Sequence, residues 1–240
     1  MLDPELELQM TPPTLRLKDS ASLTIEWQEV QEAEGYRLRF RADDEGWQNI
    51  DSLIKGTSVR KKGLRPAKRY YFSVLPEIST TVTKRYISSL GSLPLQVDIL
   101  SPHISRLLPS SLMSPTGKVD TADALVGKVV CIYFSAHWCG PCRNYTPQLA
   151  DFYKSTKSNN NFEVVFCSAD HSESEFSSYF MSHPWKAIPY NNAEREALQT
   201  LFKVNGIPRL VVLAPSGKIA CDNAVSMSLT SSTIDSWSKL

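Results

Sequence analysis

The chain has 240 residues, of which 42% are hydrophobic and 21% are charged, and 26 Lys and Arg residues face 25 Asp and Glu residues. This composition is typical of soluble globular proteins and excludes a collagen-like fibre and a disordered tail. A formal net charge of +1 provides no overall field for attracting nucleic acid or an anionic membrane, so we expect neither as a partner. The 5 Cys residues are too few for a secreted scaffold that depends on disulfides.

The N-terminal sequence MLDPELELQM is acidic and has no continuous apolar stretch, so it lacks the features of a secretory signal. The longest apolar runs, such as residues 129–134, have the length of a strand and are far too short to span a bilayer. We therefore expect a cytoplasmic protein, with the nucleus as an alternative, in which most Cys residues are reduced thiols.

The first part of the chain, up to about residue 92, contains short stretches in which apolar and polar residues alternate. In residues 22–27, for example, Leu23, Ile25 and Trp27 alternate with polar residues, which places them on one face of a strand. We predict strands at 22–27, 35–41, 47–50, 58–61, 69–78 and 83–88, and no helix. Several short strands with turns between them are typical of an all-β sandwich.

The order of particular residues in this part resembles a fibronectin type III domain over residues 10–98. The residues are Trp27, the pair Gly35-Tyr36, the run Leu64-Arg65-Pro66, and Tyr70 four positions after the proline. The resemblance implies that Trp27 packs between two sheets and that the Tyr70 hydroxyl bonds back to the main chain. We assign residues 1–100 to a fibronectin type III-like β-sandwich, which would present or restrict protein partners.

A cluster of basic residues lies in the same part of the chain, and two interpretations of it stay open at this point. Its members are Arg60, Lys61, Lys62, Arg65, Lys68 and Arg69. Such a cluster either is a nuclear-import or polyanion-binding patch or forms the solvated face of a sheet.

Residues 89–116 are rich in Pro and Ser and indicate a linker that leads into the first strand of a second domain. From there on, strands alternate with helices. We predict strands at 128–134, 162–168, 209–214 and 218–221, and helices at 141–155, 173–182, 193–203 and 231–238. This alternation indicates an α/β domain over residues 101–240.

The single Cys-x-x-Cys motif, Cys139-Gly140-Pro141-Cys142, stands between a buried strand and a helix. A thiolate attacks disulfides, and an unperturbed Cys with a pKa near ~8.5 supplies few thiolates at neutral pH. At the start of a helix, unpaired backbone N–H groups and the helix dipole favour the anion, and Pro141 suits the first turn. We predict that Cys139 is the nucleophile and that Cys142 is the resolving Cys.

A zinc site is the alternative interpretation of this Cys pair, and a structural zinc site needs four ligands. Cys131, Cys167 and Cys221 stand alone on apolar strands, and the four His residues show no paired spacing. We therefore expect no metal and no cofactor, and we interpret these three Cys residues as core thiols.

The motif with its preceding Trp138, the helix residue Pro147, and Gly206-Ile207-Pro208 before the next buried strand resemble the thioredoxin superfamily. The resemblance implies an α/β fold with a central mixed sheet flanked by helices. It also implies a cis bond before Pro208, although a proline that merely begins a strand is the alternative. Trp138, Gly140, Pro141, Ile207 and Pro208 would then form or support the substrate groove, and Cys139 and Cys142 would form a redox-active disulfide.

Within the superfamily, three further segments are similar to tryparedoxins and nucleoredoxins: the strand before the motif, residues 162–168 and residues 184–190. The chain departs from these relatives in having Gly140-Pro141 where they have two prolines, Ala169 where tryparedoxins have tryptophan, and Arg209 where threonine is usual. Tyr133 occupies the place of the buried aspartate of ordinary thioredoxins, as it does in the tryparedoxin branch.

We therefore expect a thiol–disulfide oxidoreductase that reduces protein disulfides by dithiol–disulfide exchange. Its upstream dithiol reductant would be trypanothione, glutathione or a reductase. The alternative is an adaptor with a thioredoxin fold that binds partners without turnover, although an intact Cys pair argues against it. A secretory disulfide isomerase is disfavoured because the chain ends in Trp237-Ser238-Lys239-Leu240 and carries no retention signal.

Overall fold

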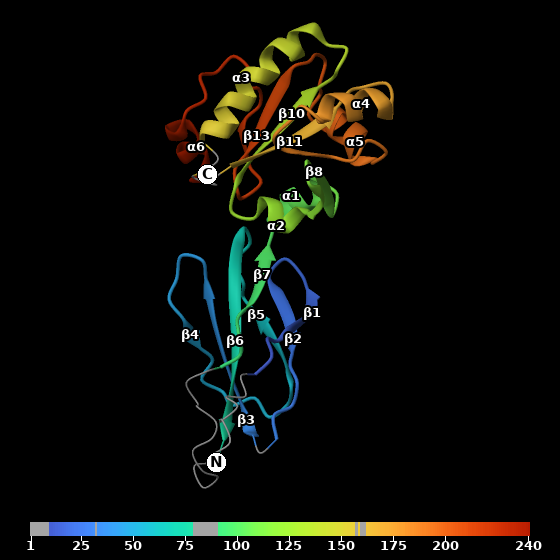
Figure 1. Ribbon diagram of the computed structural model, residues 1–240. Coiled ribbons are helices and arrows are strands. Elements are labelled where there is room, and N and C mark those ends of the chain that lie inside the picture. The colour runs from blue at the N-terminus through green and yellow to red at the C-terminus, as the bar shows by residue number, and fades with distance from the viewer. Residues whose placement is uncertain (1–9, 32, 79–90, 157, 159–161) are drawn as a thin grey trace, which may run out of the picture. The chain divides into compact units, whose positions relative to one another are not determined.

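A computed structural model of the protein describes residues 10–31, 33–78, 91–156, 158 and 162–240 (Figure 1). The chain divides into two compact units, Met1–Ile99 and Leu100–Leu240. In the part of the chain that is described, no helix is long and apolar enough to cross a membrane.

The described elements of the first unit are all strands, arranged in two antiparallel sheets. One sheet has the order β1-β2-β5 and consists of Thr14–Lys18, Ser22–Glu26 and Ser58–Lys62. The other has the order β4-β3-β6-β7 and consists of Gln48–Asn49, Ala33–Ala42, Lys68–Ile78 and Leu95–Ile99. The strands predicted at 22–27, 35–41, 47–50, 58–61 and 69–78 are therefore present, whereas the prediction at 83–88 lies outside the described residues.

Both sheets contribute to one apolar core, because alternate residues of each strand point the same way. Ile25 comes from the first sheet, and Leu38 and Phe72 come from the second; all three are fully buried. Trp27 is buried and meets Tyr36 edge-on, with ring centroids 5.4 Å apart. The backbone N–H of Arg65 donates to the Tyr70 hydroxyl at 2.8 Å, which is the kind of contact with the main chain that the sequence predicts.

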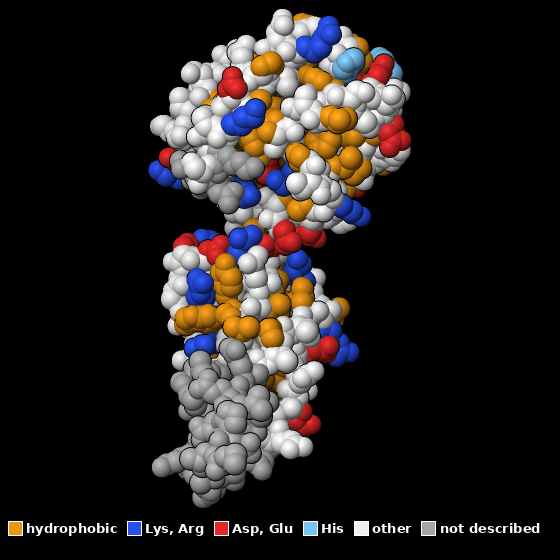
Figure 2. Space-filling view, viewed as in Figure 1, with side chains coloured by type: hydrophobic (Ala, Val, Ile, Leu, Met, Phe, Trp, Pro, Cys, Tyr) orange, Lys and Arg blue, Asp and Glu red, His pale blue; other side chains and the backbone are white. Residues whose placement is uncertain are grey.

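Most of the basic cluster forms ion pairs with carboxylates of the same unit. The pairs are Arg60 with Asp19, Arg65 with Glu45, Lys68 with Asp44, and Arg69 with Asp98. Figure 2 likewise shows Lys and Arg side chains interspersed with Asp and Glu side chains on the viewed face. This arrangement favours a mixed, solvated surface over a polyanion-binding patch.

The second unit is built on a seven-stranded mixed sheet with the order β14-β13-β10-β11-β12-β8-β9. The central strands β10 (Val129–Ser135) and β11 (Phe162–Ser168) are parallel, and β13 (Arg209–Leu213) runs antiparallel to β10. The shorter strands are β8 (Ser111–Ser114), β9 (Gly117–Asp120), β12 (Lys186–Ala187) and β14 (Ile219–Cys221).

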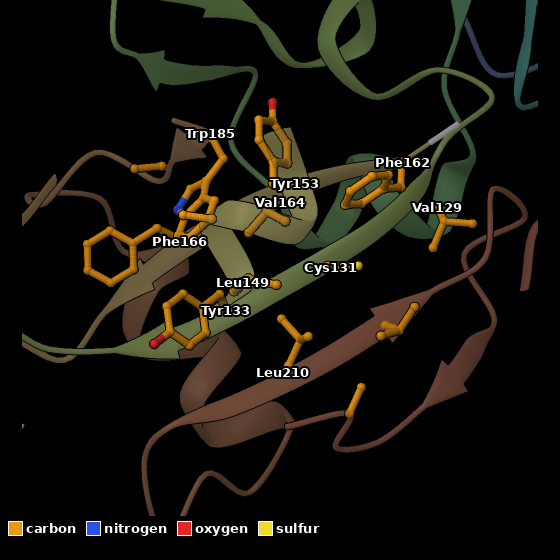
Figure 3. Packing of buried hydrophobic residues seen from close by; sticks show 14 of the residues in the cluster. Val129, Cys131, Tyr133, Leu149, Tyr153, Phe162, Val164, Phe166, Trp185 and Leu210 are labelled. Carbon is orange, nitrogen blue, oxygen red and sulfur yellow. The ribbon is translucent and has the colours of Figure 1, made fainter. Parts of the chain in front are cut away.

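Helices cover both faces of this sheet, so its central strands are buried throughout. Alternate residues of β10 enter two different cores: Cys131 and Tyr133 pack with α3 (Gly140–Thr156), α4 (Glu173–Phe180) and α6 (Ser231–Ser238) (Figure 3). Ile132 and Phe134 pack with α1 (Pro102–Leu107), α2 (Thr121–Leu125) and α5 (Glu194–Leu201) on the other face. Burial on both faces explains why β10 is continuously apolar rather than alternating.

The expectation of a linker at 89–116 was wrong, because much of the described part of this range is regular structure. Residues Leu95–Ile99 form β7, Pro102–Leu107 form α1 and Ser111–Ser114 form β8. Pro102 stands in the first turn of α1, and the Ser101 side chain accepts from the backbone N–H of His103 at 3.3 Å. Pro and Ser are common in linkers, but here they begin a helix.

Candidate functional site

The Cys pair lies where the central strand β10 passes into α3. The strand ends at Ser135 and the helix begins at Gly140, so Cys139 stands directly before the first helical residue. The backbone N–H of Arg143 donates to the Cys139 carbonyl at 3.1 Å, which is the first bond of the helix. Cys139 therefore holds the N-cap position, where unpaired backbone donors converge.

Cys139 and Cys142 form a disulfide, with Cα atoms 5.2 Å apart. The backbone N–H of Cys142 donates to Cys139 Sγ at 3.2 Å, so the sulfur takes the place that an N-cap oxygen takes in other helices. Pro141 has no N–H to leave unpaired at this end. After reduction, the N–H bond and the helix dipole would both favour negative charge on Cys139 Sγ.

The two sulfurs differ in access, as their assigned roles require. Cys139 is 5% exposed and Cys142 is fully buried, while Gly140 is half-buried and Pro141 is exposed. Ala136, Ala169 and Ile207 pack around the pair. An incoming sulfur can therefore reach Cys139, and Cys142 can reach it only from within the protein.

The segment Ile207-Pro208 forms the opposite side of the site, immediately before β13. The peptide bond between the two residues is cis, as the resemblance to the thioredoxin superfamily implies, and the carbonyl oxygen of Ile207 lies 3.7 Å from Cys139 Sγ. Both residues are half-buried. The antiparallel pairing of Phe134 with Arg209 brings this segment beside the end of β10.

Trp138 provides an exposed aromatic surface next to Cys139. Its side chain is 48% exposed, and its indole N–H donates to the carbonyl oxygen of Ala169 at 3.2 Å. The ring stacks on that of His171, with centroids 5.3 Å apart and planes within 7°. All seven predicted site residues thus lie in one region, around the start of α3 and the cis bond.

Behind Cys142, four buried hydroxyl groups form a connected network. Thr146 Oγ1 donates to the carbonyl oxygen of Cys142 at 2.9 Å. The hydroxyl oxygens of Tyr133 and Tyr179 lie 2.8 and 2.5 Å from Thr146 Oγ1. Ser135 Oγ lies 3.2 Å from the Tyr179 hydroxyl. The Tyr133 hydroxyl also donates to the carbonyl oxygen of Cys142, at 3.4 Å. Burial raises the pKa of Tyr133 above its usual value, so this group stays protonated near neutral pH.

Three residues at the site were missed by the sequence reasoning: Asp170, His171 and Arg195. Asp170 accepts from the backbone N–H of His137, His171 stacks on Trp138, and Arg195 donates to the carbonyl oxygens of Ser168 and Asp170. The sequence offered one indication for Asp170 and His171, which lie two and three residues after β11. Because β11 is parallel to β10, residues after both strands meet at the same edge of the sheet. Nothing in the local sequence marks Arg195, which lies in α5.

The other three Cys residues are free thiols. Burial raises the pKa of Cys131 and of Cys167 to about 12, so these two thiols are poor nucleophiles at neutral pH. Cys221 is half-buried, and its sulfur lies 3.5 Å from Met227 Sδ. Among the described residues, no three His, Cys, Asp or Glu side chains are grouped to hold a metal ion.

Arg209, one of the departures from the related proteins, contacts Asp222, the residue that follows β14. Its guanidinium binds both carboxylate oxygens of Asp222 at 2.7 Å and donates to the carbonyl oxygen of Lys203 at 3.1 Å. The side chain therefore connects β13 with the segments on either side of it.

Comparisons with known proteins agree with this geometry. Residues 127–219 match a family described as thioredoxin-like. Tryparedoxin of Trypanosoma brucei brucei is 42% identical over 120 residues, which are 48% of this chain and 83% of that protein. Human nucleoredoxin is 41% identical over 116 residues, which are 48% of this chain but only 27% of that protein.

A solved structure of tryparedoxin II in complex with glutathionylspermidine is also similar, with 37% identity and a TM-score of 0.50. The similarity covers 52% of this chain and 90% of that one. The similarity to tryparedoxins thus extends over most of their length, and the one to nucleoredoxin covers about a quarter of it. The chain belongs to the thioredoxin superfamily, with tryparedoxins and nucleoredoxins among its relatives.

Proposed function

We propose that the protein is a thiol–disulfide oxidoreductase that reduces protein disulfides through Cys139 and Cys142. The observation that carries the proposal is the position of Cys139. Its sulfur caps the start of α3, accepts the N–H of Cys142 and is bonded to a deeper second sulfur. A sulfur in this position is suited to attack, and its buried neighbour is suited to resolve the product.

In the reaction, the Cys139 thiolate attacks one sulfur of the substrate disulfide, and the other substrate sulfur leaves as a thiolate. Cys142 then attacks Cys139 Sγ and releases the first substrate sulfur, while its own proton is transferred to a leaving thiolate. The substrate gains two electrons, and the protein ends as the Cys139–Cys142 disulfide. An upstream dithiol then reduces this disulfide and closes the cycle.

The upstream reductant in this proposal is trypanothione, glutathione or a reductase. Support for a small thiol comes from the related tryparedoxin whose structure contains glutathionylspermidine. The residues that would form the groove for either reaction partner are Trp138, Gly140, Pro141, Ile207 and Pro208. Three free thiols elsewhere in the unit support a reducing compartment, which we propose to be the cytoplasm or the nucleus.

For the first unit, we propose a fibronectin type III-like fold that presents or restricts protein partners. Its two antiparallel sheets around one core, its buried Trp27, and the bond between Arg65 and the Tyr70 hydroxyl support this assignment. In this proposal, residues 101–240 carry out the disulfide exchange and residues 1–100 select the protein partners.

Trapping with Cys142→Ser tests this function directly. Without the resolving sulfur, the mixed disulfide between Cys139 and a substrate persists, so we expect covalent adducts in a cell lysate that dithiothreitol releases. The matched variant Cys139→Ser keeps the Cys142 thiol of the pair but lacks the nucleophile. It should form no adducts and should not reduce insulin. Adducts through Cys131, Cys167 or Cys221, or wild-type insulin turnover of Cys139→Ser, would refute the assigned roles. An empty trap together with a wild-type protein that reduces insulin no faster than dithiothreitol alone would favour the adaptor.

A further inference from the structure

A buried carboxylate lies behind the turn that carries the Cys pair. Asp170 is only 3% exposed, and both of its carboxylate oxygens are bonded. Oδ1 accepts from the backbone N–H of His137 at 2.6 Å, and Oδ2 accepts from Ser168 Oγ at 2.7 Å. His137 is two residues before Cys139, so this carboxylate holds the backbone of the reactive turn from behind.

The loop that carries Asp170 is itself held on several sides. The backbone N–H of Ala169 donates to the carbonyl oxygen of Ser135 at 2.9 Å, and the Ala169 carbonyl oxygen accepts from the Trp138 indole at 3.2 Å. On the α5 side, Arg195 donates to the carbonyl oxygens of Ser168 and Asp170 at 3.1 and 3.4 Å. The loop 168–171 therefore joins α5 to the turn 136–139.

The guanidinium of Arg195 is well placed for this task. Its side chain is 13% exposed, and its charge lies over the ring of Tyr190, 4.4 Å from the centroid. Its single carboxylate contact among the described residues is Glu196, at 3.6 Å, and that side chain is 81% exposed. The buried contacts of Arg195 are thus with the loop backbone and the aromatic ring, and the ion pair is at the surface.

We propose that Asp170 is a positioning residue for disulfide exchange, with Arg195 holding the loop on which it stands. The inference rests on the proposed function. It states that the loop 168–171 holds the reactive turn 136–139 in the geometry that the reaction needs. A buried carboxylate is costly to desolvate unless its oxygens are bonded, and here one bond goes to the reactive turn itself. Small displacements of a reacting group cost large factors in rate, so this bond matters for the reaction of Cys139.

Loss of the Asp170 charge and loss of its bond to His137 should shift the pH dependence of the Cys139 reaction in opposite directions, which makes the proposal testable. Removing a nearby negative charge would by itself favour the Cys139 thiolate and would shift its reaction to lower pH. Losing the bond to His137 would instead move Cys139 Sγ relative to the N–H of Cys142 and shift the reaction to higher pH. Asp170→Ala removes the charge and the bond together, whereas Asp170→Asn removes the charge and keeps an acceptor for the His137 N–H.

The experiment measures alkylation of reduced Cys139 by iodoacetamide from pH 5 to pH 9 in the full chain. We expect Asp170→Ala to react about tenfold more slowly at pH 7 and to shift the profile to higher pH, and we expect Asp170→Asn to stay near the wild type or shift to lower pH. Exchange of the His137 amide with deuterium should accelerate in Asp170→Ala alone. An unchanged or lower profile in Asp170→Ala would overturn the proposal.

Arg195→Gln provides an independent second variant if Asp170→Ala does not fold. It should slow the alkylation and accelerate exchange of the His137 amide, and the matched control Glu196→Gln, which removes only the surface ion pair, should change neither. Equal effects of the two substitutions would contradict the role of the loop bonds. Because alkylation needs no disulfide substrate, these outcomes are distinguishable from a failure of the proposed reductase activity, which insulin reduction by the wild type reports.

Discussion

His183 is a buried histidine among aromatic rings. It is 3% exposed, and neither ring nitrogen has a hydrogen-bonding partner among the residues that the structure describes. The rings of Phe166, Tyr179 and Trp185 surround it, with centroids 4.5 to 4.9 Å from its own. Because the charged form cannot be solvated there, burial lowers the pKa of His183 to about 3.

This low pKa predicts a loss of stability in mild acid. In the unfolded chain a histidine binds a proton below about pH 6.5, whereas folded His183 binds one only near pH 3. The contribution of neutral His183 to the free energy of unfolding is therefore fully present above about pH 6.5 and is lost as the pH is lowered toward 3. Between pH 7 and pH 5, His183 should remove about 2 kcal/mol from the free energy of unfolding.

His183→Leu nearly conserves the side-chain volume and removes the proton-binding site. We expect urea denaturation to show about 2 kcal/mol less loss of stability in this variant than in the wild type between pH 7 and pH 5. His137→Gln, at an exposed histidine, should retain the wild-type pH dependence. If His183→Leu and the wild type lose the same free energy, the assignment of the acid sensitivity to His183 is incorrect.

At the scale of elements, α4 shows how local sequence and tertiary packing combine. Ser172 caps the helix by accepting the backbone N–H of Glu175 at 3.2 Å, and the Glu175 carboxylate accepts the backbone N–H of His171 at 3.0 Å. Phe176, Tyr179 and Phe180 follow at helical spacing and are buried against the sheet. The cap therefore sets where a helix begins that supplies much of the aromatic core.

Ser172→Ala removes this cap, and we expect it to lower the free energy of unfolding by about 1 kcal/mol. Urea denaturation measures the loss, and faster deuterium exchange of the Glu175 amide localises it to the first turn. Ser177→Ala is the matched control, since Ser177 is exposed within the same helix and alanine is the better helix former. Equal stability of Ser172→Ala and Ser177→Ala would show that the cap contributes nothing.

At the scale of the whole molecule, each unit has its own core. Among the described residues, one apolar cluster draws only on residues up to Ile99, and the other three draw only on residues from Leu100 onward. Units that bury their apolar surface separately are able to fold separately.

We therefore predict that residues 100–240 fold alone and reduce insulin with the kcat/KM of the full chain. Circular dichroism and the insulin assay measure the two properties. A fragment of residues 109–240 is the matched control: it loses α1 with the fully buried Ile104, and it should be less stable. An unfolded 100–240 fragment would mean that the units depend on each other for stability.

Most of the fold was accessible from patterns within single segments. Alternation in β3 and β6, continuous apolar character in β10 and β11, and helical spacing in α3 and α4 each report how one element is buried, so the sequence predicted these elements well. The elements that it missed, β1, β7, α1, β8, β9, α2 and β12, are short, and several contain Pro, Ser or Gly. Segments of this length carry too few periods to reveal their burial, and tertiary pairing decides their conformation.

The sequence by itself predicted where the candidate redox site lies, because a Cys-x-x-Cys motif between a buried strand and a helix places both sulfurs through local geometry alone. The resemblance of its motifs to the thioredoxin superfamily implied the cis bond before Pro208, which the structure contains. Only the tertiary structure decided what holds that motif in place. The contact of Asp170 with His137 joins residues 33 positions apart, and it exists because β10 and β11 are parallel neighbours whose ends coincide at Ser135 and Ser168. Such a contact depends on register between strands, which no local pattern encodes.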